Sequence, residues 1–290
     1  MMKSIIINLL LLTVVFTQNT NKTVLTIEKK LQDDMLANKL FDERKFQLAI
    51  IEFERLKLSV DDINKFKVYQ QKIAESYLKR GERIEAINEY RKLTNIDSAH
   101  FISTFKIANI YQDLYYFYES NQFLDKVNKN FKGSQLDTLE FLKAINYFAL
   151  NKPDSALSMF QNNTLIQESS KAISIINDYN NMNKKNPKTA SYLNTIFPGA
   201  GYLYLDLIQT GVATFFVEAL FGYATIASAN NGYTFGSIFG GILFSGFYIG
   251  SIYGASQQAV KKRNLLLNDT VFALKIILRG LQSKDGVVNE

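Results

Sequence analysis

The pattern of apolar positions changes along the chain, and each pattern predicts a different kind of element. A short apolar run, Ile5–Phe16, precedes a long region, Leu25–Tyr179, in which apolar residues recur at three- and four-residue spacing. That spacing is typical of helices with one buried face. Charged residues then nearly vanish from Lys188 to Gln258, and a second amphipathic segment, Leu265–Leu281, follows. The chain is therefore predicted to be all-α.

Small residues recur in pairs within the first amphipathic region, twelve positions apart. The pairs are Ala37 and Ala49, Ala74 and Ala86, Ala108 and Ser120, and Ala144 and Ala156. A larger residue follows each first member by three positions (Leu40, Tyr77, Tyr111, Tyr147) and each second member by four (Phe53, Tyr90, Leu124, Phe160). Small residues allow two antiparallel helices to approach closely, so the register predicts four helix pairs. A plain helical bundle is the alternative.

This register resembles the tetratricopeptide repeat (TPR), a helix–turn–helix unit of 34 residues. Arg80-Gly81-Glu82 also stands where that family turns between its helices. The resemblance implies a TPR-like helical solenoid over residues 25–182, with Leu165–Tyr179 covering its last repeat.

In TPR proteins the first helix of each pair lines a groove that holds a peptide or a partner helix. The resemblance thus implies a partner-binding groove formed by Met35, Asn38, Gln71, Lys72, Glu75, Phe105, Lys106, Asn109 and Gln112. The set of Lys72, Lys106, Asn38 and Asn109 is similar to the clamps with which some TPR domains hold a peptide carboxylate, although Glu75 interrupts it. A solvated helix face is the alternative interpretation.

The region 188–258 is predicted to be a membrane domain. Two apolar segments, about residues 209–229 and 235–256, are separated by Asn230-Asn231-Gly232. Each has about the 20 residues that a helix needs to cross a bilayer. We expect a transmembrane helical hairpin, with a hairpin buried in a soluble domain as the alternative. The segment at 261–282 is predicted to form a separate amphipathic helix that lies on the membrane surface or on the repeats.

The residues that lead into the hairpin carry a further resemblance. Pro198, Gly199, Gly201 and Tyr204 form a Pro-Gly-x-Gly-x-x-Tyr element. It is similar to an element of bacterial membrane domains that are loosely related to the TM2 family and are largely uncharacterised. Because Pro and Gly interrupt helices, residues 189–206 are expected to be a re-entrant or interfacial segment packed on the hairpin.

Glycines predict how the two apolar helices meet. Gly246, Gly250 and Gly254 repeat every four residues, and the first segment carries a stripe of small or polar residues that includes Gly211 and Gly222. Stripes of small residues permit close packing of helices in membranes. We expect the two stripes to face each other. The glycine-rich helix could instead pack against a second copy of the chain, which would give a homo-oligomer.

Glu218 is the one charged residue between Gln209 and Gln258. A carboxylate in the middle of a membrane span costs a few kcal/mol, which makes it a candidate functional group. One hypothesis makes it a neutral, structural carboxyl group that is hydrogen-bonded to Ser245, Tyr248 or Tyr253. The other makes it a site that responds to protons or ions.

The N-terminus and the charges give conflicting topologies. A basic start, the short run Ile5–Phe16 and a polar exit are typical of a secretory signal peptide, here residues 1–18, with an uncleaved anchor as the alternative. Lys and Arg flank the hairpin on both outer sides, which favours a cytoplasmic location for both flanks. Long domains are exported largely regardless of charge. We therefore expect a bacterial inner-membrane protein with a periplasmic repeat domain and lipid contacts at the hairpin.

Composition narrows the functional classes. The chain has no Cys, one His (His100) and a formal net charge of +6 spread over amphipathic helices. These features argue against disulfides, Cys-based metal sites and nucleic-acid binding. No nucleophile–base set, phosphate loop or metal-ligand cluster is recognisable. We expect a non-catalytic membrane-anchored scaffold that binds a protein or peptide, without cofactor or metal. An oligomeric channel-like or transporter-accessory protein is the alternative.

Overall fold

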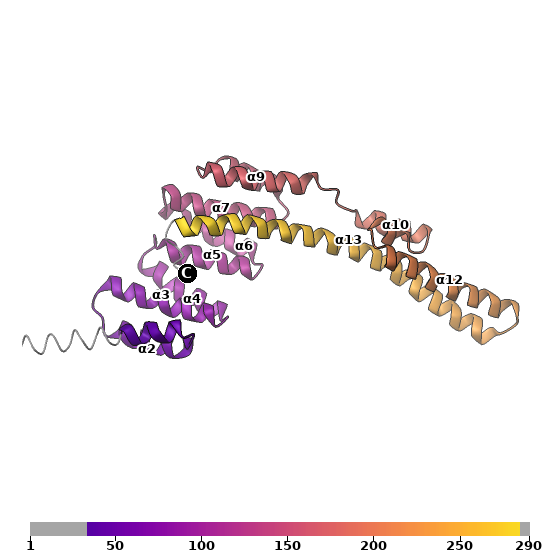
Figure 1. Cartoon of the computed structure of the whole chain (residues 1–290), viewed down its shortest axis with the longest axis horizontal. Coiled ribbons are helices and arrows are strands. Elements are labelled where there is room, and N and C mark those ends of the chain that lie inside the picture. The colour runs from indigo at the N-terminus through magenta and orange to yellow at the C-terminus, as the bar shows by residue number, and fades with distance from the viewer. Residues whose placement is uncertain (1–33, 285–290) are drawn as a thin grey trace, which may run out of the picture. The chain divides into compact units, whose positions relative to one another are not determined.

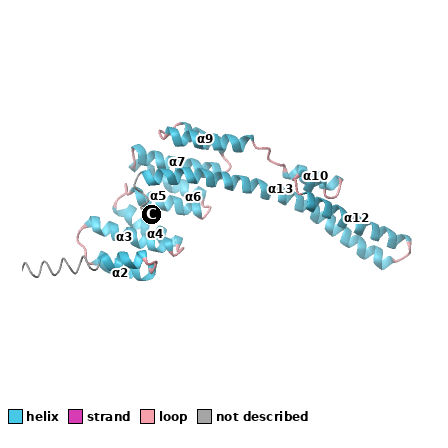
Figure 2. Ribbon diagram, in the orientation of Figure 1, coloured by secondary structure: helices cyan, strands magenta, loops and turns pink. Residues whose placement is uncertain are grey.

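The computed structural model describes residues 34–284, with side chains up to residue 281. Every regular element in this part of the chain is a helix, and none is a strand (Figure 2). The all-α prediction is confirmed. The predicted signal peptide, residues 1–18, lies outside the described residues.

The chain divides into two compact units, the first ending at Asn146 and the second beginning at Tyr147. The sequence pattern had placed the boundary later, between the end of the predicted repeats at residue 182 and the start of the predicted membrane domain at residue 188. The second unit begins earlier because helix α9 (Ile166–Asn181) contacts the long helix α13 (Thr234–Lys284) and so belongs with it.

The first unit is a succession of helices that contact their neighbours in the chain (Figure 1). A helix at residues 34–42 is followed by α2 (Phe46–Leu58), α3 (Ile63–Lys79), α4 (Arg83–Ile96), α5 (Phe101–Asp113), α6 (Phe117–Val127), a 3-10 turn (Asn128–Asn130) and α7 (Gly133–Ala149), whose last residues belong to the second unit.

One turn geometry recurs at the same place in each predicted helix pair. A residue with left-handed backbone, φ between 59° and 85°, occupies positions 44, 81, 115 and 151. The amide of the next residue donates to the carbonyl five residues earlier each time: Lys45 to Leu40, Glu82 to Tyr77, Tyr116 to Tyr111 and Lys152 to Tyr147, at 2.8–3.0 Å. This is the Schellman ending of a helix, which satisfies carbonyls that the helix leaves free. Each left-handed residue lies seven positions after the first small residue of its pair.

The small residues of the register are all inside the protein. The four Ala residues and their partners, from Ala37 to Ala156, each have an exposed fraction of 0%. The large residues four positions after the second member are buried as well, namely Phe53, Tyr90, Leu124 and Phe160. Burying one such side chain contributes about 1.5–3 kcal/mol. The spacing of small and large residues therefore marks the interior faces of the helices.

The second unit contains α8 (Pro153–Gln161), α9, α10 (Pro187–Ile196), α11 (Ala200–Tyr204), α12 (Ile208–Asn230) and α13. Asn186 caps α10 by accepting a hydrogen bond from the Lys188 amide at 2.8 Å, and Pro187 takes the first helical position. Proline suits that position because its missing N–H is not needed there. Helices α12 and α13 lie side by side (Figure 1) and make the most extensive helix–helix contact of the unit.

Helices α12 and α13 are long and apolar enough to cross a membrane. Their most apolar windows are only 6% and 11% buried. The core helix of a soluble protein hides its apolar side chains, so this exposure favours a lipid environment.

Helix α13 joins two segments that were expected to be separate. It continues from Thr234 to Lys284, through the predicted apolar span and the predicted amphipathic helix. The junction contains Gln, Ala, Lys and Arg, which favour helix, and no Pro. The expected break near residues 257–261 is therefore absent. The part beyond the junction buries Val271, Leu274, Leu278 and Leu281, while Leu265, Phe272 and Ile276 stay exposed.

Candidate functional site

The Pro-Gly-x-Gly-x-x-Tyr element builds the junction of α10, α11, α12 and α13. Gly199 has φ +84°, and a Cβ there would collide with the carbonyl oxygen of Gly211 on α12. A Cβ on Gly201 would collide with the carbonyl oxygen of Ala190 on α10 and lie 3.0 Å from the Cβ of Ala255 on α13. Both positions thus require glycine, because the backbones of the neighbouring helices lie too close to α11 for a side chain.

Hydrogen bonds hold α10 against α13. Ser191 Oγ donates to the Ile252 carbonyl at 3.0 Å, and the Tyr248 hydroxyl donates to the Thr195 carbonyl at 2.6 Å. Asn194, which is fully buried, donates to Ser251 Oγ at 2.9 Å and accepts from the Gly201 amide at 3.1 Å. The segment 189–206 is thus two short helices fastened to α13. Whether it enters a membrane remains a prediction.

Tyr204, the last residue of the element, fixes the entrance to α10. Its hydroxyl accepts a hydrogen bond from the Asn186 amide at 3.0 Å, and its ring carries the Lys185 ammonium at 4.8 Å from the centroid. Lys185 also lies 3.5 Å from Asp206, a residue with φ 60°. The Lys262 ammonium donates to the Leu205 carbonyl. Basic side chains therefore gather at this end of α12.

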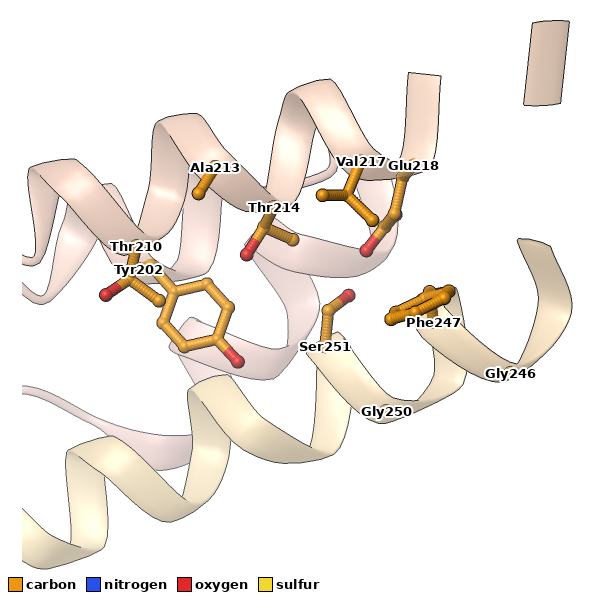
Figure 3. A pocket seen from close by; sticks show the side chains of 10 residues that line it. All are labelled: Tyr202, Thr210, Ala213, Thr214, Val217, Glu218, Gly246, Phe247, Gly250 and Ser251. Atoms are coloured by element: carbon orange, nitrogen blue, oxygen red, sulfur yellow. The ribbon is translucent and has the colours of Figure 1, made fainter. Parts of the chain in front are cut away.

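A cavity of about 370 Å³ opens between α12 and α13 beside this junction (Figure 3). Tyr202, on α11, is one wall. Glycines and apolar side chains dominate the rest, and the lining comprises Tyr202, Thr210, Ala213, Thr214, Val217, Glu218, Gly246, Phe247, Gly250 and Ser251. Figure 3 shows the Glu218 carboxyl group and the Ser251 hydroxyl both pointing into the space between the two helices.

Glu218 is buried in this cavity without a partner. Its exposed fraction is 1%, and neither Oε1 nor Oε2 has a hydrogen-bond partner among the described residues. The Ser251 hydroxyl already donates to the Tyr248 carbonyl at 3.0 Å. An unsatisfied buried carboxyl group is costly, by about 1–3 kcal/mol when neutral and more when charged. Among native buried groups it is the kind of exception that calls for a ligand or a function.

The hydrogen bonds expected for Glu218 are absent. Ser245, Tyr248 and Tyr253 were its predicted partners. The Tyr248 hydroxyl is taken by Thr195, Tyr253 is 65% exposed, and neither Glu218 oxygen accepts from Ser245. The predicted hydrogen bonds are therefore wrong within the described residues, and the neutral, structural role of the carboxyl group stays a prediction. The helical spacing correctly placed Glu218 on the side of α12 that faces α13, but it could not supply a donor.

The glycine stripe of α13 meets its neighbours differently from the expectation. Gly246 and Gly250 have no atom within 4 Å of where a Cβ would lie, so neither makes the expected close contact. The close approach to α12 occurs earlier, where a Cβ on Gly240 would collide with Thr225 and a Cβ on Gly236 would lie 3.0 Å from the Ser228 hydroxyl. An i, i+4 stripe turns by about 40° at each step around a helix. Its members therefore need not share one neighbour.

The other three predicted packing glycines do touch neighbours. A Cβ on Gly222 would lie 3.4 Å from the Phe244 ring on α13, and one on Gly254 would collide with the Tyr202 hydroxyl on α11. A Cβ on Gly211 would lie 2.9 Å from the Gly199 carbonyl oxygen and from Leu203. The nearest neighbours of Gly211 therefore belong to the Pro-Gly element.

The predicted groove of the first unit is only partly open. Phe105 is 1% exposed and Gln112 is 2% exposed, so neither is available to a ligand, and this part of the prediction is wrong. Gln112 instead donates to the Asn146 side chain at 2.6 Å in a buried network with Ser120 and Asn121. The sequence did carry a signal for this burial: Asn146 stands among apolar residues, and a buried amide side chain needs polar partners such as Gln112.

The remaining groove residues are accessible at least in part, namely Met35, Asn38, Gln71, Lys72, Glu75, Lys106 and Asn109. Glu75 accepts from Gln71 at 2.9 Å and lies 3.6 Å from the Lys72 ammonium. Lys72 also stands 4.5 Å above the Phe41 ring. Burial lowers the pKa of Lys106, and the Glu75 charge partly opposes that shift. The surface thus mixes charges that already contact one another.

The described residues do not form a recognisable metal centre. Among residues 34–284, no group of three or more His, Cys, Asp or Glu side chains could hold a metal ion. The Glu218 cavity offers one carboxyl group, several hydroxyl groups and apolar walls. Such a site can pair with a cation or exchange a proton. Comparison of the chain with protein-family models, with curated proteins and with solved structures finds no match.

Proposed function

We propose that this chain is a membrane-anchored scaffold whose TPR-like repeats bind a partner protein or peptide. The observation that carries the proposal is the fourfold turn at positions 44, 81, 115 and 151, in register with the buried small residues. Repeated helix pairs of this kind stack into extended surfaces that serve binding more often than catalysis. The scaffold is non-catalytic in this proposal.

The binding surface is the accessible face of α3 and α5. Lys72, Glu75 and Lys106 give it both signs of charge, and Asn109 adds an amide. Such a surface suits an extended or helical peptide with polar side chains. The mutual contacts of Gln71, Lys72 and Glu75 must be exchanged for contacts with the partner, which favours selectivity over high affinity.

The anchor in this proposal is α12 with the first half of α13. Their exposed apolar side chains and the basic residues near Asp206 and at Lys261–Arg263 suit a bilayer with its headgroups at that end. We place the protein in the bacterial inner membrane with the repeats in the periplasm. Reporter fusions after Asn183, Asn231 and Glu290 test this topology, and an active cytoplasmic reporter after Asn183 would contradict it.

Site-specific photocrosslinking tests the scaffold. A benzoylphenylalanine at Asn109 of the full chain, in native membranes, is expected to give a discrete protein adduct. The matched control carries the same group at Gln122, an exposed polar residue of α6. Adducts that are the same from both positions, or lipid adducts only, would contradict a binding face on α5.

A channel-like or transporter-accessory protein is the second candidate. The observation that favours it is the buried, unpartnered Glu218. Purified chain in vesicles would then pass protons or monovalent cations, and Glu218→Gln would abolish the flux. Vesicles that stay as tight as protein-free vesicles would exclude this candidate.

A further inference from the structure

The cavity at Glu218 lacks the group that its chemistry requires. The carboxyl group is 99% buried, and no described residue hydrogen-bonds to it. No Lys, Arg or His occurs between Ile208 and Val260. The spanning part of the chain therefore contains no cation for this acid.

The deficit does not depend on the protonation state. An ionised carboxylate without a counter-ion costs several kcal/mol in an apolar medium. A neutral carboxyl group has one O–H donor and acceptor sites, and the described chain satisfies neither. Either form gains from an external partner.

The wall of the same cavity is shaped for close approach. Gly246 and Gly250 line it, both are exposed, and open space lies where their side chains would be. Two glycines four residues apart let another helix come close to the backbone of a membrane helix. The unsatisfied acid and the bare glycine wall are independent observations that concern one cavity.

We propose that this cavity is the docking site for a transmembrane helix of another protein, one that carries a single Lys or Arg near the bilayer midplane. Glu218 is the eleventh residue of α12, so it lies about 15 Å along a helix of 23 residues, near its middle. The pairing neutralises two groups that are each costly in lipid. A cavity of about 370 Å³ is at the small end of ligand sites and accepts one long side chain.

A second copy of this chain does not meet the same requirement. Its spanning helices carry no basic residue between Ile208 and Val260, so a copy cannot neutralise Glu218 at that depth. Charge complementarity thus selects a different protein. The site is separate from the groove proposed on α3 and α5, and the two proposals can fail independently.

The test uses the full chain in phosphatidylcholine vesicles with synthetic transmembrane peptides. The peptides are Leu/Ala helices with one central Lys, one central Leu or one central Glu. The chain has no native cysteine, so Asn231→Cys in the hairpin turn carries a single donor fluorophore. Energy transfer to labelled peptide measures association. We expect the Lys peptide to associate at least tenfold more tightly than the Leu peptide, and the Glu peptide to be the weakest.

Two variants separate charge from shape. Glu218→Gln keeps the size of the side chain and should abolish the preference for Lys. Gly250→Leu fills the cavity and should weaken association of the Lys peptide at least tenfold, whereas the control Ala224→Leu, at an exposed position of α12, should not. Circular dichroism and alkaline extraction show that each variant is folded and inserted.

Three results would overturn the proposal. The first is equal association of the Lys and Leu peptides, and the second is a Lys preference that survives in Glu218→Gln. The third is energy transfer between two labelled copies of the chain, if Gly250→Leu abolishes this transfer and an excess of Lys peptide does not reduce it. That last result would assign the cavity to a second copy.

Discussion

Substituting the glycines of the α11 junction should open the second unit in a graded way. Gly199→Ala places a side chain at φ +84° and against the Gly211 carbonyl oxygen. Gly201 does not have a positive φ, so Gly201→Ala brings only a steric conflict, which is with the Ala190 carbonyl oxygen. Gly250→Ala meets neither, because nothing lies within 4 Å of its Cβ position.

The magnitudes follow from these contacts. A left-handed backbone costs a non-glycine residue about 1–2 kcal/mol, and overpacking against backbone costs about 1–3 kcal/mol. Gly199→Ala should therefore destabilise the junction by about 2–5 kcal/mol. Gly201→Ala should cost about 0–2 kcal/mol, because its overpacking is offset by the roughly 1 kcal/mol higher helix propensity of Ala. Gly250→Ala should be neutral or stabilise by up to about 1 kcal/mol.

Cysteine accessibility measures the opening. Ala255 is fully buried at the junction, and the chain has no native cysteine, so Ala255→Cys gives a single buried thiol. Its maleimide labelling rate in detergent rises with the population of the open form, by about tenfold for each 1.4 kcal/mol. We expect Gly199→Ala to speed labelling by at least thirtyfold, Gly201→Ala by less, and Gly250→Ala not at all. Equal rates in Gly199→Ala and Gly250→Ala would refute the steric argument.

Three further predictions concern the first unit. Arg44 and Gly81 both have positive φ (61° and 85°), a conformation that favours glycine, so Arg44→Gly should stabilise the unit by about 1 kcal/mol and Gly81→Ala should destabilise it by a similar amount. A Cβ at Gly81 meets nothing within 4 Å, so the cost there comes from the backbone alone. Thermal unfolding followed by circular dichroism checks the opposite signs. Asn146→Leu should cost about 2–4 kcal/mol, because it removes the shared partner of a buried network, and faster hydrogen exchange in α5 and α6 would show it. Burial lowers the pKa of His100, whose Nδ1 caps α5 by accepting from the Ser103 amide at 3.3 Å. Burial therefore favours the neutral imidazole in the folded chain, and the stability that this cap contributes above about pH 6.5 should be lost as the pH drops through the lowered pKa of the folded state. At pH 5 the backbone amide hydrogens in the first turn of α5 should exchange faster in the wild-type chain than in His100→Asn, because Asn caps the helix without titrating. Equal exchange rates in the two proteins would contradict the pH effect.

Local patterns in the sequence determined the fold class and much of the interior. The twelve-residue spacing of Ala and Ser identified residues that are all buried, because only small residues fit where paired helices cross. Low charge and length identified α12 and α13 as candidate spans, because these properties depend on composition alone. The location of Glu218 on the helix face toward α13 also followed from helical spacing.

Tertiary structure decided which neighbour each face meets. Periodicity shows which residues share a face, but it does not show what packs against that face. Phe105 and Gln112 therefore had the register of groove residues and proved to be buried. For the same reason Gly246 and Gly250 line a cavity while Gly236 and Gly240 make the close contact with α12.

The same limit applies to polar groups and to helix ends. Glu218 was expected to find a hydroxyl partner, yet the hydroxyl of Tyr248 is engaged by α10, a helix far away in the chain. Asn146 found its partners on α5 and α6 through contacts that span 25–34 residues. The sequence by itself determined which residues need burial or a partner. Only the packing of distant segments decided whether the partner was present, because hydrogen bonds and steric contacts act over a few ångströms in space and not along the chain.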